Sequence, residues 1–100
     1  MDKNTSPDLK FDQGKSRVDL IEPGFLLSMG DVLGYGAEKY EEESWKEVPR
    51  GEDRYYAAAM RHLLAMRSGE LVDKESGLPH IAHAACNIMF LQYMQELKNV

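Results

Sequence analysis

A run of fourteen residues near the end of the chain is almost entirely apolar and limits the folds open to it. Between Ile81 and Met94, eleven residues are apolar, and the polar exceptions include His83 and Asn87. A helix that is apolar on all sides is buried on all sides, and a chain of 100 residues offers too few partner helices to surround it. We therefore expect the chain to form a homo-oligomer, a dimer or tetramer, whose copies together complete a helical bundle.

Sequence signals predict three main helices. Pro23 opens the first, whose apolar positions recur every three or four residues, and we expect it to reach about Glu43. Its glycines at 30, 34 and 36 are interpreted as places of close helix contact, with a break near Gly34 as the alternative. The second helix is expected from about 53 to 67, before the stop signal Gly69. Pro79 opens the third, which reaches about Lys98.

These signals predict an all-α fold, a compact domain of three main helices over residues 21–100. Residues 1–20 are polar, lack a helical period and are expected to form an extended N-terminal arm. The end of the arm, residues 17–21, is expected to add a short strand or to lie across the body of the protein. Residues 70–78 form an acidic loop before the third helix.

Composition excludes several classes of protein. The net charge of −5 argues against a protein that coats nucleic acid, so we expect no direct nucleic-acid partner. No run approaches the roughly 20 apolar residues that cross a bilayer, and the amino terminus lacks the features of a signal peptide. Cys86 is the only cysteine and sits in an apolar run, which favours a buried thiol. We expect a reducing, cytoplasmic location.

Polar groups gather around the start of the third helix. His80, His83 and Asn87 fall within a stripe roughly 60° wide on a helix, and three acids lie just upstream, Glu70, Asp73 and Glu75. Carboxylates and imidazoles are common ligands of divalent cations. The alternative is that each histidine is a core residue with a hydrogen bond to the protein.

The first two predicted helices carry further charged candidates. Arg54 and Arg61 are seven residues apart and share a face, with His62 beside them. Arginine at such a site pairs either with the acidic loop or with a phosphate. Glu38 and Glu41 are three residues apart, so they either share a cation or form a solvated helix end.

Taken in order, these segments resemble the N-terminal domain family of phage dATP/dGTP diphosphohydrolases, over roughly residues 10 to 95. The matching segments are Gly14-Lys15-x-Arg17-x-Asp19-Leu20-Ile21, Gly36-Ala37-x-Lys39-Tyr40, Ser44-Trp45, Arg54-Tyr55, Arg61-His62-Leu63, Gly69-Glu70-x-x-Asp73 and Glu75-Ser76-Gly77-Leu78-Pro79-His80-x-Ala82-His83-Ala84-x-x-Asn87. The family is similar in role to the all-helical MazG-type nucleotide pyrophosphatases.

The resemblance implies cleavage of a deoxypurine nucleoside triphosphate, dGTP or dATP, into the monophosphate and pyrophosphate with Mg²⁺ or Mn²⁺. It also implies phage nucleotide metabolism in the host cytoplasm. MazG-type enzymes carry one acidic pair on each of two helices. Here Glu38-x-x-Glu41 and Glu70-x-x-Asp73 are the candidate pairs, although the second falls at a helix end or in a loop.

Roles for single residues follow from the implied reaction. The metal ligands are expected among Glu38, Glu41, Glu70, Asp73, His80 and His83. His62 or Glu75 is expected to orient or deprotonate water. Substrate contacts are expected from Lys15, Arg17, Lys39, Trp45, Arg61 and Asn87, the last with both a donor and an acceptor for a purine edge.

Two alternative functions fit the same residues. In the first, the chain is a non-catalytic module that binds nucleotides or docks on another protein. In the second, it is a helical oligomer with a buried polar network and no ligand.

Overall fold

The computed structural model describes residues 13–98, and within them the chain is helical. The elements are η2 (Val18–Leu20), α2 (Pro23–Lys39), η3 (Ser44–Glu47), α3 (Gly51–Arg67) and α4 (His80–Lys98). Extended pairing in this part of the chain amounts to one isolated antiparallel bridge, between Val72 and Pro79. The all-α prediction is therefore confirmed. The first twelve residues of the predicted arm lie outside the described residues.

Helix α2 begins as predicted and ends earlier. The Glu22 side chain accepts a hydrogen bond from the Phe25 backbone N–H at 2.8 Å, and Pro23 occupies the first turn. The helix continues through all of its glycines and stops at Lys39, so the expected extension to Glu43 is wrong. The backbone of Tyr40 leaves the helical region (φ −125°, ψ −140°), and Glu43 is left-handed with φ 58°.

The glycines at 30, 34 and 36 do not mark contacts of α2 with other parts of residues 13–98. A Cβ atom placed on Gly30, Gly34 or Gly36 would meet no other heavy atom within 4 Å, apart from its neighbours and the backbone of the helix itself. The contact interpretation is therefore wrong for the single chain.

Helix α3 starts two residues before the predicted position and ends at the predicted one. Arg50, with φ 56°, turns the chain into the helix at Gly51. A Cβ on Gly51 would lie 2.8 Å from the terminal methyl of Met94, so glycine allows the start of α3 to approach α4 closely. Gly69 has φ 111° and donates to the Met66 carbonyl at 3.0 Å, which confirms the stop signal.

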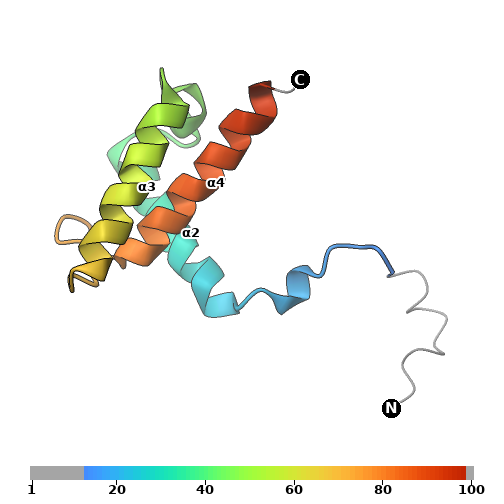
Figure 1. The fold of residues 1–100 in the computed structure, drawn as a ribbon, viewed down its shortest axis with the longest axis horizontal. Helices are drawn as coiled ribbons and strands as arrows, with labels where there is room; N and C mark the ends of the chain where they lie inside the picture. The colour runs from blue at the N-terminus through green and yellow to red at the C-terminus, as the bar shows by residue number, and fades with distance from the viewer. Residues whose placement is uncertain (1–12, 99–100) are drawn as a thin grey trace, which may run out of the picture.

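Helix α4 is the centre of the domain. It packs along α3 and is crossed by α2, as Figure 1 shows, and within residues 13–98 α2 and α3 do not pack on each other. A small core joins α2 to α4. Its buried members are Val32, Ala82 and Cys86, with Met29, Leu33, Leu78 and Phe90 packed around them.

One chain does not cover α4 completely. Ile81 and Ile88 remain 47% and 53% exposed, so the expected homo-oligomer stays a prediction. None of the helices in the described part of the chain is long and apolar enough to cross a membrane.

The described end of the arm points away from the helices in Figure 1. Residues 18–20 form a single 3-10 turn and no strand, and the segment does not lie across the body. Both expectations for residues 17–21 are therefore wrong. Val18 and Leu20 are 68% and 70% exposed, so no apolar contact holds this segment against the domain.

Candidate functional site

Three histidines meet where α3 passes the first turns of α4. The Nδ1 atoms of His62 and His80 are 2.8 Å apart. The rings of His62 and His83 stack with centroids 4.5 Å apart and planes 8° apart. We call His62, His80 and His83 the histidine cluster. The predicted stripe on α4 is therefore real, and α3 completes it with His62.

Glu70 fixes the orientation of His80. Its Oε1 lies 2.7 Å from Nε2 of His80, and this hydrogen bond, together with a smaller effect of Lys74, holds the pKa of Glu70 below its ordinary value. Because Nε2–H donates to the carboxylate, Nδ1 of a neutral His80 accepts the proton that Nδ1 of His62 donates. Hydrogen bonds thus link Glu70, His80 and His62 in that order.

Asp73 reaches His83 through a serine. The Ser76 hydroxyl lies 2.8 Å from Oδ2 of Asp73 and 2.7 Å from Nε2 of His83. The Ser76 backbone N–H also donates to Oδ2 at 3.0 Å. Burial by itself raises the pKa of Asp73, but the hydrogen bonds from Ser76 outweigh it, and the net pKa lies below the ordinary value. Asp73 is therefore a carboxylate at neutral pH.

Burial also keeps two of the histidines neutral. It lowers the pKa of His62, and the neighbouring His83 and His80 lower it further. Burial likewise lowers the pKa of His83, while Asp73 opposes the shift. A neutral imidazole has a free lone pair, which is the form that binds a metal or accepts a proton.

Glu75 lies apart from the histidine cluster and is held by α2. Its Oε2 accepts hydrogen bonds from the Lys39 ammonium and, at 3.1 Å, from the Tyr35 hydroxyl. Lys39 first and Tyr35 second lower the pKa of Glu75. The Tyr35 ring also meets His83 edge-on, with centroids 6.4 Å apart.

A groove of about 1170 Å³ opens between α2 and α3, with α4 as its floor. It exists because these two helices pack on α4 and not on each other. Six of the predicted site residues line it, namely Lys39, Glu41, Trp45, Arg61, His83 and Asn87. His83 is the member of the histidine cluster that faces this groove.

Arg54 and Arg61 lie on the α3 wall of the groove. Their spacing of seven residues places them about 10 Å apart along the helix axis. Within residues 13–98 neither forms a hydrogen bond or an ion pair with another side chain. The alternative in which Arg61 pairs with the acidic loop is therefore not what the structure has.

Trp45 on η3 also lines the groove. Its ring stacks on Phe90 with centroids 4.4 Å apart and meets Tyr93 edge-on at 5.0 Å. The Tyr55 hydroxyl donates to the Trp45 carbonyl at 2.7 Å. These contacts hold a half-buried indole in one position beside the groove.

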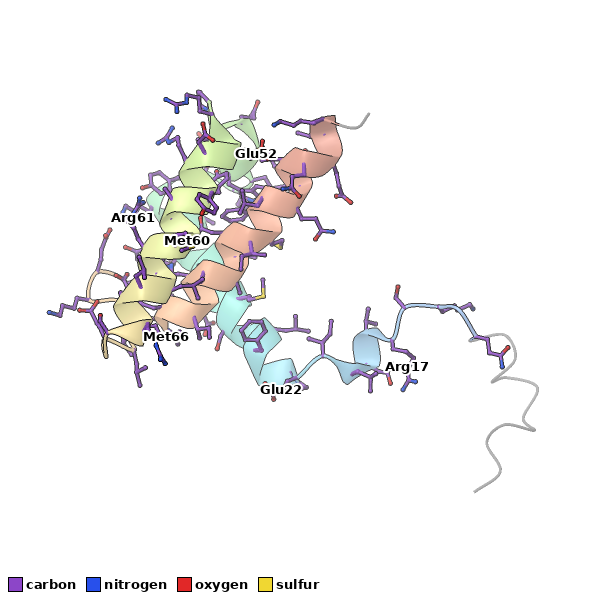
Figure 2. The ribbon with its side chains drawn as sticks, viewed as in Figure 1. Arg17, Glu22, Glu52, Met60, Arg61 and Met66 are labelled. Carbon is purple, nitrogen blue, oxygen red and sulfur yellow. The ribbon has the colours of Figure 1, made fainter. Side chains whose placement is uncertain are left out.

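Three of the predicted site residues do not join the site within this chain. Lys15 and Arg17 lie on the arm, where Arg17 pairs with Asp19 at 2.9 Å, and Figure 2 shows Arg17 far from Arg61. Glu38 is exposed on α2 and does not line the groove. Because α2 ends at Lys39, Glu38 and Glu41 do not form the helical pair expected for one cation.

Two site residues were missing from the predictions. Ser76 joins Asp73 to His83, and a signal for it exists in the sequence, because aspartate commonly accepts a hydrogen bond from a nearby backbone N–H in a turn. Tyr35 touches both Glu75 and His83. No sequence pattern indicates Tyr35, since its partners are distant along the chain.

The donor types near α4 suit a divalent cation, although their present contacts are with one another. Asp73 and Glu70 supply carboxylate oxygens, and His80 and His83 supply imidazole nitrogens. Over residues 13–98, no three His, Cys, Asp or Glu side chains form a group that could hold a metal ion as they stand. Metal binding would replace the hydrogen bonds to Ser76 and His80 with bonds to the ion.

Comparisons with known proteins point to one family. The family model described as "dATP/dGTP diphosphohydrolase, N-terminal" matches residues 5–100. The chain is also 37% identical, over 86 residues, to a dATP/dGTP diphosphohydrolase of Salmonella phage PMBT28. That match covers 86% of this chain and 29% of the phage protein, so the chain spans less than a third of that relative's length. No solved structure matches the chain.

Proposed function

The chain belongs to the family of dATP/dGTP diphosphohydrolase N-terminal domains, and from this membership we propose that it hydrolyses deoxypurine nucleoside triphosphates. The reaction converts dGTP or dATP and water into the nucleoside monophosphate and pyrophosphate. Mg²⁺ or Mn²⁺ is the proposed cofactor, and the cytoplasm of an infected host is the proposed location.

Two arginines in the groove that have no side-chain partner among residues 13–98 are the observation that carries this proposal. Arg54 and Arg61 line a groove that also contains His83 and Asn87. A guanidinium binds phosphate oxygens with paired hydrogen bonds. Two such groups on one wall suit a ligand with several phosphates, and a protein of net charge −5 needs local cations to accept it.

Glu70, Asp73, His80 and His83 are the side chains that would hold the metal. When bound, a divalent cation stabilises negative charge on the phosphate oxygens and favours the deprotonated form of an attacking water. His83 faces the groove and the others lie behind it, so the ligands would gather at the end of the groove nearest the start of α4.

His62 is the better of the two proposed general bases. Its Nδ1 is engaged with His80, while its Nε2 has no hydrogen-bond partner among residues 13–98. Burial and the neighbouring histidines hold the pKa of His62 below its ordinary value, so at neutral pH its Nε2 has a free lone pair that can accept a proton from water. Glu75 is a weaker candidate, because Lys39 lowers its pKa and occupies its carboxylate.

A panel of deoxynucleoside triphosphates, incubated with the protein and Mg²⁺ and analysed by chromatography, tests the reaction. We expect monophosphate and pyrophosphate from dGTP or dATP, faster than from dTTP or dCTP. Release of single phosphates, or equal rates on all four nucleotides, would contradict the proposal. Asp73→Ala should abolish turnover in a protein that remains folded.

Arg61→Ala tests the role of the groove arginines. We expect kcat/KM to fall by about 10- to 100-fold, because a charged hydrogen bond to phosphate contributes roughly 1.5–3 kcal/mol. Arg67→Ala is the matched control, since Arg67 lies on the same helix and does not line the groove. Equal losses in both variants would show that general charge, and not the groove, attracts the substrate.

A non-catalytic nucleotide-binding or helical interaction module is the second candidate. Mutual hydrogen bonding within the histidine cluster favours it, because each carboxylate there already has a partner. Thermal stabilisation by dGTP and Mg²⁺ without turnover would support this candidate over the first.

A further inference from the structure

The amide of Asn87 has a fixed orientation in the floor of the groove. Its Nδ2 donates to the carbonyl of His83, one turn earlier on α4, at 2.8 Å. A carbonyl oxygen requires a donor, so this contact assigns the amide nitrogen and the amide oxygen without ambiguity. One of the two N–H groups of Asn87 is thereby used within the protein.

The other end of the amide, Oδ1, is an acceptor without a partner. Asn87 is only 9% exposed, yet it lines the groove. Among residues 13–98, no group donates a hydrogen bond to its Oδ1. Every buried side-chain nitrogen or oxygen atom among residues 13–98 has a hydrogen-bond partner, so this oxygen is open to the groove, where water or a ligand can supply the donor.

The chemistry of an amide oxygen excludes phosphate as its partner, because phosphate oxygens are themselves acceptors. Aromatic surface lies close by instead. Phe90 lies three residues after Asn87 on the same helix, and its ring stacks on Trp45. Both rings line the groove with Asn87. Flat apolar surface beside a single acceptor suits the edge and face of a nucleobase.

We propose that Oδ1 of Asn87 accepts a hydrogen bond from an N–H group on the purine edge and thereby makes the groove selective for bases that carry it. This inference rests on the proposed function and adds the element that selects the base. Three groups have the required chemistry: the 6-amino group of adenine, and the 1-imino and 2-amino groups of guanine. The arginines on the α3 wall are left for the phosphates.

Substrate analogues test the proposal with the unaltered protein. The purine 2′-deoxyribonucleoside triphosphate lacks the amino group of dATP, dITP lacks the 2-amino group of dGTP, and 1-methyl-dGTP lacks its imino hydrogen. We expect at least one of these losses to lower kcat/KM by about tenfold or more, because a bound base that covers the acceptor without supplying a donor replaces its water with nothing. If none of them lowers kcat/KM, the proposal is overturned.

Asn87→Leu completes the test, because it removes the acceptor at similar volume. The penalty for the missing N–H should then disappear, so that analogue and parent nucleotide react equally well. Gln92→Leu is the matched control, since it removes an exposed amide of α4 that does not line the groove, and it should retain the penalty. An equal fall for parent and analogue in Asn87→Leu would assign Asn87 to the positioning of His83 and overturn the proposal.

Two further measurements complete the design. The first distinguishes a contact with the base from a contact with the sugar, and the second measures binding separately from turnover. A dideoxynucleotide lacks the 3′-hydroxyl, and an Asn87-dependent penalty for that loss would place the sugar at Oδ1 and overturn the proposal. Calorimetric binding of α,β-methylene nucleotides with Mg²⁺ gives a readout that needs no turnover. If the protein binds the parent nucleotide more tightly than the analogue but hydrolyses neither, the role of Asn87 is supported and the proposed reaction is wrong. If it neither discriminates in binding nor hydrolyses, both the role of Asn87 and the proposed reaction are overturned.

Discussion

Ser76 shows how a single small side chain holds the site together. Its hydroxyl stands between Asp73 and His83, whose own contact is a longer 3.6 Å. Because the backbone N–H of Ser76 binds the same carboxylate oxygen, the loop before α4 is folded around Asp73. The orientation of the predicted ligand pair therefore depends on a residue that is not itself a predicted ligand.

Ser76→Ala should lower the free energy of unfolding by about 1–2 kcal/mol, because two partly buried partners lose a hydrogen bond. Urea denaturation at pH 7 in the presence of EDTA measures this loss without any metal. Ser68→Ala is the control, since the exposed Ser68 hydroxyl donates a hydrogen bond to the Ala65 carbonyl and, within residues 13–98, to no other group. Equal effects in the two variants would mean that the Asp73–Ser76–His83 contacts do not stabilise the fold.

Cys86 should not react in the folded protein. The thiol is fully buried, contacts the Met29 carbonyl at 3.5 Å, and has a pKa raised by burial to about 11. At pH 8 only about one thiol in a thousand is then the reactive thiolate. Ellman's reagent should therefore detect no thiol in the native protein and one equivalent in guanidinium. Rapid native labelling would contradict the burial of Cys86.

Among the helices, two glycines have opposite surroundings. Gly30 lies inside α2 with open space beside it, while a Cβ on Gly51 would meet the end of Met94 on α4. Helix propensity favours alanine over glycine at both positions, so the difference between them depends on packing. The first glycine is dispensable for the fold of one chain, and the second sets how closely α3 approaches α4.

Gly30→Ala should raise the free energy of unfolding by up to about 1 kcal/mol. Gly51→Ala should lower it by about 1 kcal/mol, because Met94 must move to make room. Urea denaturation of the two variants side by side measures the difference. Destabilisation by Gly30→Ala would show that something packs on that side of α2.

The groove is also a property of the arrangement of elements. Each helix shows its own apolar spacing in the sequence. The angles at which the three helices cross cannot be read from that spacing, and they are the reason that α2 and α3 both pack on α4 and leave space between them. Lys39 on α2, Arg61 on α3 and Asn87 on α4 line the same groove only because of that crossing.

Taken as a whole, a single copy of the protein leaves apolar surface exposed. Tyr56, Met60 and Leu64 follow one another at intervals of four along α3 and are 60%, 38% and 61% exposed. Figure 2 shows Met60 on α3, the helix that pairs with α4. Residues four apart lie on one face of a helix, so this face is a continuous apolar stripe, and we expect a second copy of the chain to cover it.

Light scattering coupled to size-exclusion chromatography should give two or four times the chain mass of 11.4 kDa. Leu64→Lys should shift the protein toward the monomer, because a charge in a buried interface is costly. Leu97→Lys is the control, since Leu97 is similarly exposed near the end of α4. A monomer of 11.4 kDa at every concentration would contradict the prediction of a homo-oligomer.

Local signals in the amino-acid sequence were enough to predict the helical class, the position of the three helices and the polar stripe of His80, His83 and Asn87 on α4. These features follow from interactions over one or two turns, such as the cap at Glu22, the stop at Gly69 and the spacing of apolar residues. The same signals predicted the end of α2 less well, because the backbone of Tyr40 leaves the helix in a run of helix-forming residues.

Tertiary packing determined which side chains became partners. His62 is 18 residues from His80, and Tyr35 is 40 residues from Glu75, so no local spacing indicates either contact. Packing is also the reason that, among residues 13–98, Arg61 lines a groove without an ion-pair partner and Oδ1 of Asn87 has no donor in that groove. Partners far apart in sequence are brought together only by the burial of apolar helix faces against α4.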